Sequence, residues 1–253
     1  MYNESMNTVL TQELDRYNGL IRCIIRSLND MKRAIKGEIL MSEDVEGAML
    51  SMCDGQVPAM WIKSGFNSLR PLGSYIRDVQ LRLEFFRVWI EKGIPEVFWI
   101  NKFFFTHGFL TGALQNYARK YSIAIDTLAF DQVVVHDVPE DGEGVKKPED
   151  GLYCLGMLVE AGRWNPKKRF MDESEPKVLY TKCPMIHFVP AKKDAISIEG
   201  KFECPLFKTP DRRGVLMTTG HSTNYVCDIK MPTAAPAAHW VKRGVAMLLS
   251  VAE

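Results

Sequence analysis

The sequence has no excess of charge of either sign. Among its 253 residues, 32 are Lys or Arg and 31 are Asp or Glu, which gives a formal net charge of +1. Proteins that bind duplex nucleic acid depend on a surplus of basic residues, because contacts to phosphates supply much of their affinity. The balanced composition therefore argues against a nucleic-acid partner, and acidic residues lie between the basic pairs as they do in solvated loops.

Long apolar runs are also missing. No segment approaches the roughly 20 apolar residues that a membrane-spanning helix needs. The first residues, MYNESMNTVLTQELDRY, have no basic stretch that leads into an apolar one, as a signal peptide would have. We therefore expect an intracellular protein with no membrane partner.

Cysteine is sparse, and no two cysteines form a C-x-x-C pair. This spacing indicates neither a zinc site nor a redox dithiol. We expect buried free thiols in a reducing compartment. The six residues are Cys23, Cys53, Cys154, Cys183, Cys204 and Cys227.

Signatures of catalysis are equally scarce. The one Gly-Lys pair, at 200–201, is followed by phenylalanine, so no phosphate-binding loop is indicated. The stretch TTGHST at 218–223 would let a hydrolase use His221 with Ser222 or Thr223, but the G-x-S-x-G elbow of a serine nucleophile is absent. We favour a polar turn there, and we expect no catalytic group, metal or cofactor in this segment.

Residues 1–125 are predicted to form a helical subdomain. A long helix is predicted over residues 10–36, a second over 42–54, a short turn of helix after residue 58, and another long helix from 72 to 92. Both long helices carry apolar residues at alternating intervals of four and three, a heptad pattern. We expect these two heptad-bearing helices to pack against each other within one molecule, with an intermolecular coiled coil as the alternative. The first repeat consists of Leu10, Leu14, Tyr17, Ile21, Ile24, Leu28, Met31 and Ile35, and the second of Leu72, Ile76, Val79, Leu83, Phe86 and Ile90.

The stretch WINKFFFTHGFLTGALQNYARKY, at 99–121, is predicted to be the structural joint of the protein. Its first half is an aromatic run that a solvent-exposed loop would not carry, and its second half spaces apolar residues as one face of a helix. After this stretch, the spacing of apolar residues changes from a helical to a strand-like period. We expect these residues to form core between the two halves and not to line a ligand pocket. The joint residues are Trp99, Phe103, Phe104, Phe105, Leu110, Leu114 and Tyr117.

Residues 126–253 are predicted to form a second subdomain of short antiparallel strands, arranged as a small barrel or sandwich. The fold class is thus α+β. Trp164 and Trp240 lie next to or near basic residues and are candidate anchors for a protein contact, although burial is the commoner fate of tryptophan. Strands are expected over residues 128–136, 151–160, 185–189, 202–208, 225–231 and 241–251.

Several long motifs together resemble one family. FFFTHGFLTGALQNYARKYSIAID, ECPLFKTPDRRGVLMTTGHSTNYV and HWVKRGVAMLL are similar to the C-terminal domain of a dynein heavy chain, and more closely to an axonemal than to a cytoplasmic one. The match extends upstream through QELDRYNGLIRCIIRSLNDMKRAIKG. It departs from the family pattern locally, with Thr106-His107 where dyneins commonly have Pro-Gln, and Ala124 where they have proline.

The resemblance implies a helical part followed by an incomplete antiparallel β-barrel, lying on the AAA+ ring of its own heavy chain. It implies a non-catalytic domain that modulates a microtubule motor in the axoneme of a cilium or flagellum, a structure of the cytoskeleton within the cytoplasm. ATP and Mg would be bound by AAA+ modules upstream. Microtubules and the dynein intermediate and light chains would be partners of the parent chain. The alternative function is an autonomous protein-binding module that recruits another axonemal subunit.

Overall fold

The computed structural model describes residues 4–212 and 222–251, and the protein divides into two compact units. One unit contains Thr8–Gly93 with Val251–Glu253, and the other contains Met1–Asn7 with Ile94–Ser250. The boundary at residue 125 is a different division of the sequence, and it stays a prediction.

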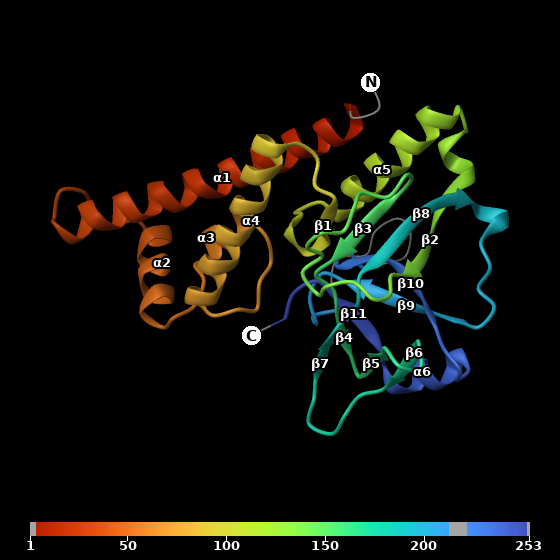
Figure 1. The fold of residues 1–253 in the computed structure, drawn as a ribbon. Coiled ribbons are helices and arrows are strands. Elements are labelled where there is room, and N and C mark those ends of the chain that lie inside the picture. Colours follow the sequence, from red (N-terminus) through yellow and green to blue (C-terminus); the bar gives the residue numbers. More distant parts are fainter. Residues whose placement is uncertain (1–3, 213–221, 252–253) are drawn as a thin grey trace. The chain divides into compact units, whose positions relative to one another are not determined.

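Four helices build the first unit (Figure 1): α1 (Glu4–Ile35, in this unit from residue 8), α2 (Glu43–Cys53), α3 (Ala59–Ser64) and α4 (Leu72–Lys92). Local signals set their ends. The hydroxyl of Ser42 accepts a hydrogen bond from Val45 N at 3.4 Å and caps α2. Gly93 ends α4 with a backbone φ of 90°, which residues other than glycine rarely adopt. The predicted helices are thus confirmed, except that α1 begins six residues before Leu10.

The long helices α1 and α4 meet through aromatic side chains. The rings of Tyr17 and Phe86 lie 5.3 Å apart, and both residues are fully buried. A second cluster forms where the end of α1 meets α2, around Met31, Val45 and Ala48. Four more methionines pack against this cluster, and their flexible side chains can fill an irregular gap. They are Met41, Met49, Met52 and Met60.

The predicted heptad repeat is not the buried stripe of α1. Leu28 and Ile35 are exposed, whereas Glu13 and Ser27, which the repeat ignores, are buried. Ser27 is buried because its hydroxyl accepts a hydrogen bond from Trp61 Nε1 at 2.9 Å. A polar residue with a buried partner thus sets the packing face. The buried stripe consists of Val9, Glu13, Tyr17, Leu20, Ser27 and Met31.

The second unit contains three sheets and the helices that accompany them (Figure 1). A four-stranded sheet has the order β1-β3-β8-β2, a five-stranded sheet has the order β10-β9-β11-β4-β7, and β5 pairs with β6 alone. The strands are β1 (Val97–Trp99), β2 (Leu128–Val134), β3 (Leu152–Leu155), β4 (Leu158–Glu160), β5 (Gly162–Asn165), β6 (Phe170–Glu173), β7 (Tyr180–Lys182), β8 (Ile186–Lys192), β9 (Lys201–Phe207), β10 (Tyr225–Pro232) and β11 (Ala246–Leu248).

The predicted α+β order of helices followed by strands is confirmed, but the sheets are neither purely antiparallel nor closed into a barrel. First, β1 pairs with β3 and β9 pairs with β11 in parallel. Second, within residues 4–212 and 222–251 no strand pairing closes the two larger sheets into a barrel. Side chains join the neighbouring edges instead, because Lys230 Nζ donates to Phe130 O at 3.1 Å and Gln132 Nε2 donates to Asp228 O at 3.2 Å.

The segment predicted as a strand over 241–251 contains instead the end of α6 (Ala237–Arg243) and the short strand β11. Pro236 precedes α6, and Gly244 closes it with a φ of 68°. The longer helix α5 (Thr106–Tyr121) lies where the joint was predicted. Short 3-10 turns occupy Ile100–Lys102, Ile125–Thr127 and Lys193–Ala195. None of the helices in the described part of the protein has the length and apolar character to cross a membrane.

Candidate protein-contact site

The joint contains a compact aromatic core. Phe103 and Phe109 are buried and stacked, with ring centroids 4.1 Å apart and an interplanar angle of 23°. Phe98, on β1, lies 5.0 Å from Phe109 and is also buried. Phe109 and Phe98 were not among the predicted joint residues, although Phe109 precedes the predicted Leu110 directly. Trp99 is half-buried at the end of β1.

The rest of the joint is less buried than predicted. Phe105 is 41% exposed, and Phe104 is half-buried. The reason is local: Phe105 lies at the N-cap position of α5, before the helix has a buried face, and its ring covers Gly108, where a Cβ atom would collide with it. Along α5, Leu110 is buried and Leu114 is half-buried.

The C-terminal end of α5 lines a pocket of about 270 Å³, although the joint was not expected to line one. The half-buried Tyr117 belongs to this lining, together with apolar residues such as Phe98, Ala113 and Leu152. At its mouth, Lys120 Nζ donates to Asp150 Oδ1 at 2.7 Å.

These charged groups shift each other's pKa. The hydroxyl of Tyr121 donates to Asp150 Oδ2 at 2.6 Å. Partial burial raises the pKa of Asp150, but the hydrogen bonds from Lys120 and Tyr121 outweigh it and hold the pKa below the usual range. The hydrogen bond to Asp150 raises the pKa of Lys120. The network ties the segment before β3 to α5.

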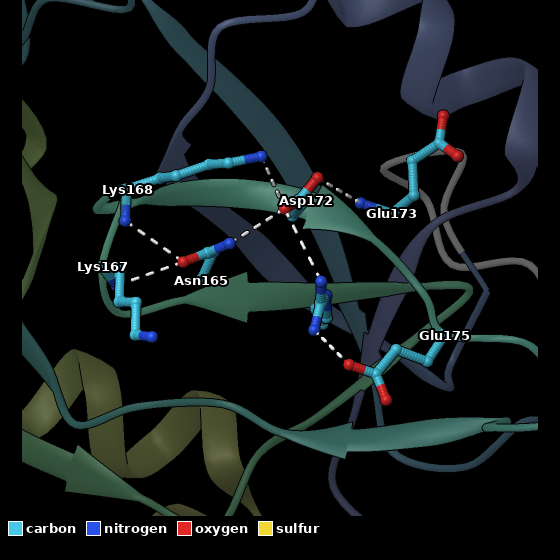
Figure 2. Close-up of polar contacts among 7 residues, drawn as sticks. Asn165, Lys167, Lys168, Asp172, Glu173 and Glu175 are labelled. Atoms are coloured by element: carbon cyan, nitrogen blue, oxygen red, sulfur yellow. Dashed lines mark hydrogen bonds and ion pairs between the residues drawn. The ribbon is translucent and has the colours of Figure 1, made fainter.

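The β5–β6 hairpin carries the polar cluster that is drawn in Figure 2. Asn165 Oδ1 accepts hydrogen bonds from the backbone N–H groups of Lys167 and Lys168, both at 3.1 Å, and this fixes the turn. Asn165 Nδ2 and Lys168 Nζ both donate to Asp172 Oδ2, at 2.9 and 3.1 Å. Arg163 Nη1 donates to Glu175 Oε1.

The cluster strongly stabilises one ionised carboxylate. Hydrogen bonds from Asn165 Nδ2, then from Lys168 and from the backbone N–H of Glu173, lower the pKa of Asp172 to about 2. The hairpin is also tied to α6, because Arg243 donates to Glu173 Oε1 at 2.6 Å. These bonds hold the loop between β5 and β6 in one conformation, with its three basic residues Lys167, Lys168 and Arg169 exposed.

The structure separates the two candidate tryptophans. Trp240 is 2% exposed, and its Nε1 donates to Thr233 Oγ1 at 2.8 Å, so it belongs to the core and does not serve as a surface anchor. Trp164, on β5, is half-buried, and its ring stacks on that of His136 with centroids 5.9 Å apart. Only Trp164 remains a candidate for a protein contact.

The stretch that resembled a hydrolase site lies mostly outside the described residues, including His221. Ser222 Oγ accepts a hydrogen bond from Asn224 N at 3.3 Å, as in a polar turn. Four cysteines of the second unit are poor nucleophiles, because burial raises the pKa of Cys183 and Cys227 to about 12 and also raises the pKa of Cys154 and Cys204 well above the usual value.

Comparison with known proteins gives one consistent result. A family model of the C-terminal domain of the dynein heavy chain matches residues 1–249. Dynein axonemal heavy chain 3 of Mus musculus is 49% identical over 248 residues, 98% of this sequence. Dynein axonemal heavy chain 12 of Rattus norvegicus is 47% identical over 98% of the sequence, and dynein axonemal heavy chain 1 of Homo sapiens is 44% identical over 99%. The 253 residues span only 6–8% of the length of these relatives.

Proposed function

This protein belongs to the family of C-terminal domains of dynein heavy chains, and from that membership we propose that it packs on the AAA+ motor ring of its own heavy chain and modulates motor output. The domain contributes no catalytic group. ATP and Mg are bound by AAA+ modules upstream in the parent chain, which moves along microtubules and carries intermediate and light chains. Its place is the axoneme of a cilium or flagellum.

Exposed apolar side chains on the helical unit support this proposal. Ile25, Leu28 and Ile35 of α1 are 54%, 43% and 68% exposed, and their spacing places them on one face of the helix. Exposed apolar side chains that share one face of a helix are candidates for an interaction surface. Because the relatives are more than ten times as long as these 253 residues, we assign this face to the remainder of the same heavy chain.

A contact of this kind modulates a motor only if its strength depends on the state of the ring. A domain that binds two ring conformations with equal affinity leaves their equilibrium unchanged, however tightly it binds. We therefore propose that the α1 face contacts the ring more extensively in one nucleotide state than in another. Each round of ATP turnover then makes and breaks part of this contact, which sets the rate of a conformational step.

The test uses the intact motor with the triple variant Ile25→Gln, Leu28→Gln and Ile35→Gln. Since the three side chains are exposed, the helical unit keeps its stability, while microtubule-stimulated ATPase rate or single-molecule run length changes at least twofold. The matched control replaces Arg22 and Arg26, exposed residues on the polar face of α1, by glutamine and leaves both quantities unchanged. If the triple variant and the control behave alike, the α1 face is not the docking surface.

A second function, that of a module which recruits another axonemal subunit, is favoured by one observation only. The half-buried Trp164 lines a surface pocket of the second unit, which contains the sheets.

A further inference from the structure

The connection between β2 and β3 has a defined path without a hydrophobic core of its own. Each residue from 137 to 151, all of which the structure describes, is half-buried or exposed. The backbone nevertheless forms two successive turns, because Gly142 N donates to Pro139 O at 3.0 Å and Val145 N donates to Gly142 O at 3.3 Å. Contacts other than buried side chains therefore hold residues 137–151, which we call the strap.

The strap lies against the outer face of the four-stranded sheet. The other face of this sheet belongs to the core, because Phe98, Cys154 and Ile186, which are neighbours across three strands, are buried. Side chains alternate along a strand, so Val97 points to the outer face. Gly142 packs closely there, since a Cβ atom on Gly142 would lie 3.1 Å from Val97 Cγ2. The strap thus covers Val97 with its backbone.

Two ion pairs hold the first part of the strap. Lys182 Nζ, on β7, donates to Glu140 Oε2 at 2.6 Å. Arg169 Nη2, in the loop between β5 and β6, lies 3.7 Å from Asp137 Oδ2. The Lys182 and Glu140 side chains are 77% and 80% exposed. Solvent weakens ion pairs of this kind, so each one stabilises the closed strap only slightly.

Contacts with the end of α5 hold the last part of the strap. Asp150 Oδ1 accepts a hydrogen bond from Lys120 Nζ at 2.7 Å, and Asp150 Oδ2 accepts one from the Tyr121 hydroxyl at 2.6 Å. Lys120 Nζ also donates to Glu149 O at 3.4 Å. The Lys120 and Asp150 side chains are 36% and 27% exposed, so water and salt reach this anchor as well.

The strap forms one wall of two separate pockets. Residues 137–140 line the pocket around Trp164, whose volume is about 340 Å³. Residues 147–151 line the pocket of about 270 Å³ beside α5. Movement of the strap away from the sheet therefore takes a wall from each pocket.

Segments with few buried apolar contacts open at a lower free energy than the core, and they open as contiguous cooperative units. The strap has both properties, because it buries no side chain and its anchors lie at its two ends. We propose that residues 137–151 open and close as one unit over the outer face of the four-stranded sheet, and that the ion pairs of Glu140 and Asp150 set the fraction of molecules in which the strap is closed. Opening uncovers Val97 and widens both pockets together, so the strap controls access to them. This device does not depend on the contact proposed for α1.

Hydrogen–deuterium exchange of the whole 253-residue protein, measured by mass spectrometry of its peptides, tests the strap. Raising the salt concentration from about 0.05 M to about 0.5 M shortens the screening length about threefold. Peptides from residues 137–151 should then exchange at least about threefold faster, because the ion pairs that keep the strap closed are weakened. Peptides from β2 and β8, which pair along seven residues, should exchange at an unchanged rate.

Two variants remove one anchor from each end of the strap. Glu140→Gln and Asp150→Asn should each speed up the exchange of the whole strap, including the end that the substitution does not touch, because the strap opens as one unit. Glu143→Gln is the matched control. Glu143 is exposed in the same segment, and its side chain forms no ion pair with the residues that the structure describes, so this variant should exchange like the wild type.

A pair of glycine variants tests the contact with the sheet. Gly142 and Gly144 both have a φ of 74°, so alanine strains the backbone equally at the two positions. Only at Gly142 would the added methyl group meet Val97, because nothing lies within 4 Å of a Cβ atom on Gly144. Gly142→Ala should therefore speed up exchange of the strap more than Gly144→Ala.

The proposal is overturned if salt and both end variants leave the exchange of the strap unchanged. It is also overturned if each end variant affects only its own end, if Glu143→Gln acts as strongly as Glu140→Gln, or if the two glycine variants behave alike. Faster exchange of β2 and β8 in the end variants would contradict it too, because the whole fold would then open and not the strap alone.

Discussion

Replacing Arg82 by methionine is expected to destabilise the helical unit by about 3–5 kcal/mol, because the change leaves a buried carboxylate without its main partner. Arg82 is 4% exposed and its Nε lies 2.8 Å from Asp78 Oδ2. Its guanidinium also lies 3.9 Å from the centre of the Phe66 ring. After the substitution, the one ion pair left to Asp78 within the described residues is the weaker contact with Arg70 Nη1, at 3.7 Å.

The size of the loss in unfolding free energy depends on how well the Asp78 carboxylate is solvated after Arg82 is replaced. Asp78 is 8% exposed, so water replaces the lost guanidinium only poorly, and the cost of the uncompensated charge exceeds the apolar contacts that methionine restores. Replacing both partners, as in Arg82→Met with Asp78→Leu, removes the charge together with its partner. We expect the double variant to recover only part of the lost stability, because the buried Tyr17 side chain still loses its hydrogen bond with Arg82.

Urea unfolding of the whole protein, followed by far-ultraviolet circular dichroism, gives the free energies. The matched control is Arg87→Met on the same helix. Arg87 also forms two hydrogen-bonded ion pairs, at 2.6 Å to Glu84 and 2.7 Å to Glu91, but it is exposed. Solvent and salt weaken such pairs, so this control leaves the unfolding midpoint unchanged. If Arg82→Met shifts the midpoint no further than Arg87→Met, burial of the charge pair does not matter as argued.

Three further experiments test other parts of the structure. Phe109→Ala should cost about 3–5 kcal/mol in thermal unfolding because its ring is fully buried, and Phe105→Ala should cost far less because its ring is 41% exposed; equal costs would contradict the assigned core. Burial raises the pKa of the Cys183 thiol from 9.0 to about 12. The contribution of the neutral thiol to stability is therefore complete below the pKa of the unfolded state and is lost as the pH rises towards about 12. Cys183→Val should make the urea midpoint fall less steeply as the pH rises through this range. Asp172, whose pKa lies at about 2, should titrate at a higher pH in the Asn165→Ala variant, as measured by the carboxyl carbon shift; an unchanged midpoint would show that the Asn165 amide is not the cause.

Much of the helical unit was predictable from local sequence. Ser42 and Gly93 mark helix ends through interactions with nearby backbone, and the structure confirms both. The packing face of α1 was not predictable, because it depends on Ser27 bonding to Trp61, 34 residues away. The spacing of apolar residues along one helix cannot indicate such a distant partner. The prediction from this spacing therefore placed the exposed Leu28 and Ile35 in the interior.

The β unit was predictable in content but not in topology. The segment from 151 to 160 was predicted as one strand, yet β3 and β4 belong to different sheets, separated by Gly156 with a φ of 91°. Strands of three residues, such as β7 and β11, show no alternation that a sequence pattern detects.

Trp164 was a candidate from the sequence alone, whereas its pocket was not. The walls come from four separate segments of the sequence, around residues 135–140, 155, 164–169 and 182–185. Only the fold brings them together.

The measurement that tests the account most directly compares the intact heavy-chain motor with one that lacks all 253 residues of this domain. If this domain modulates the motor, removing it changes the microtubule-stimulated ATPase rate, the single-molecule run length, or both, while the motor still binds microtubules and hydrolyses ATP. If both quantities are unchanged in the truncated motor, the domain does not modulate motor output and the proposed function is wrong.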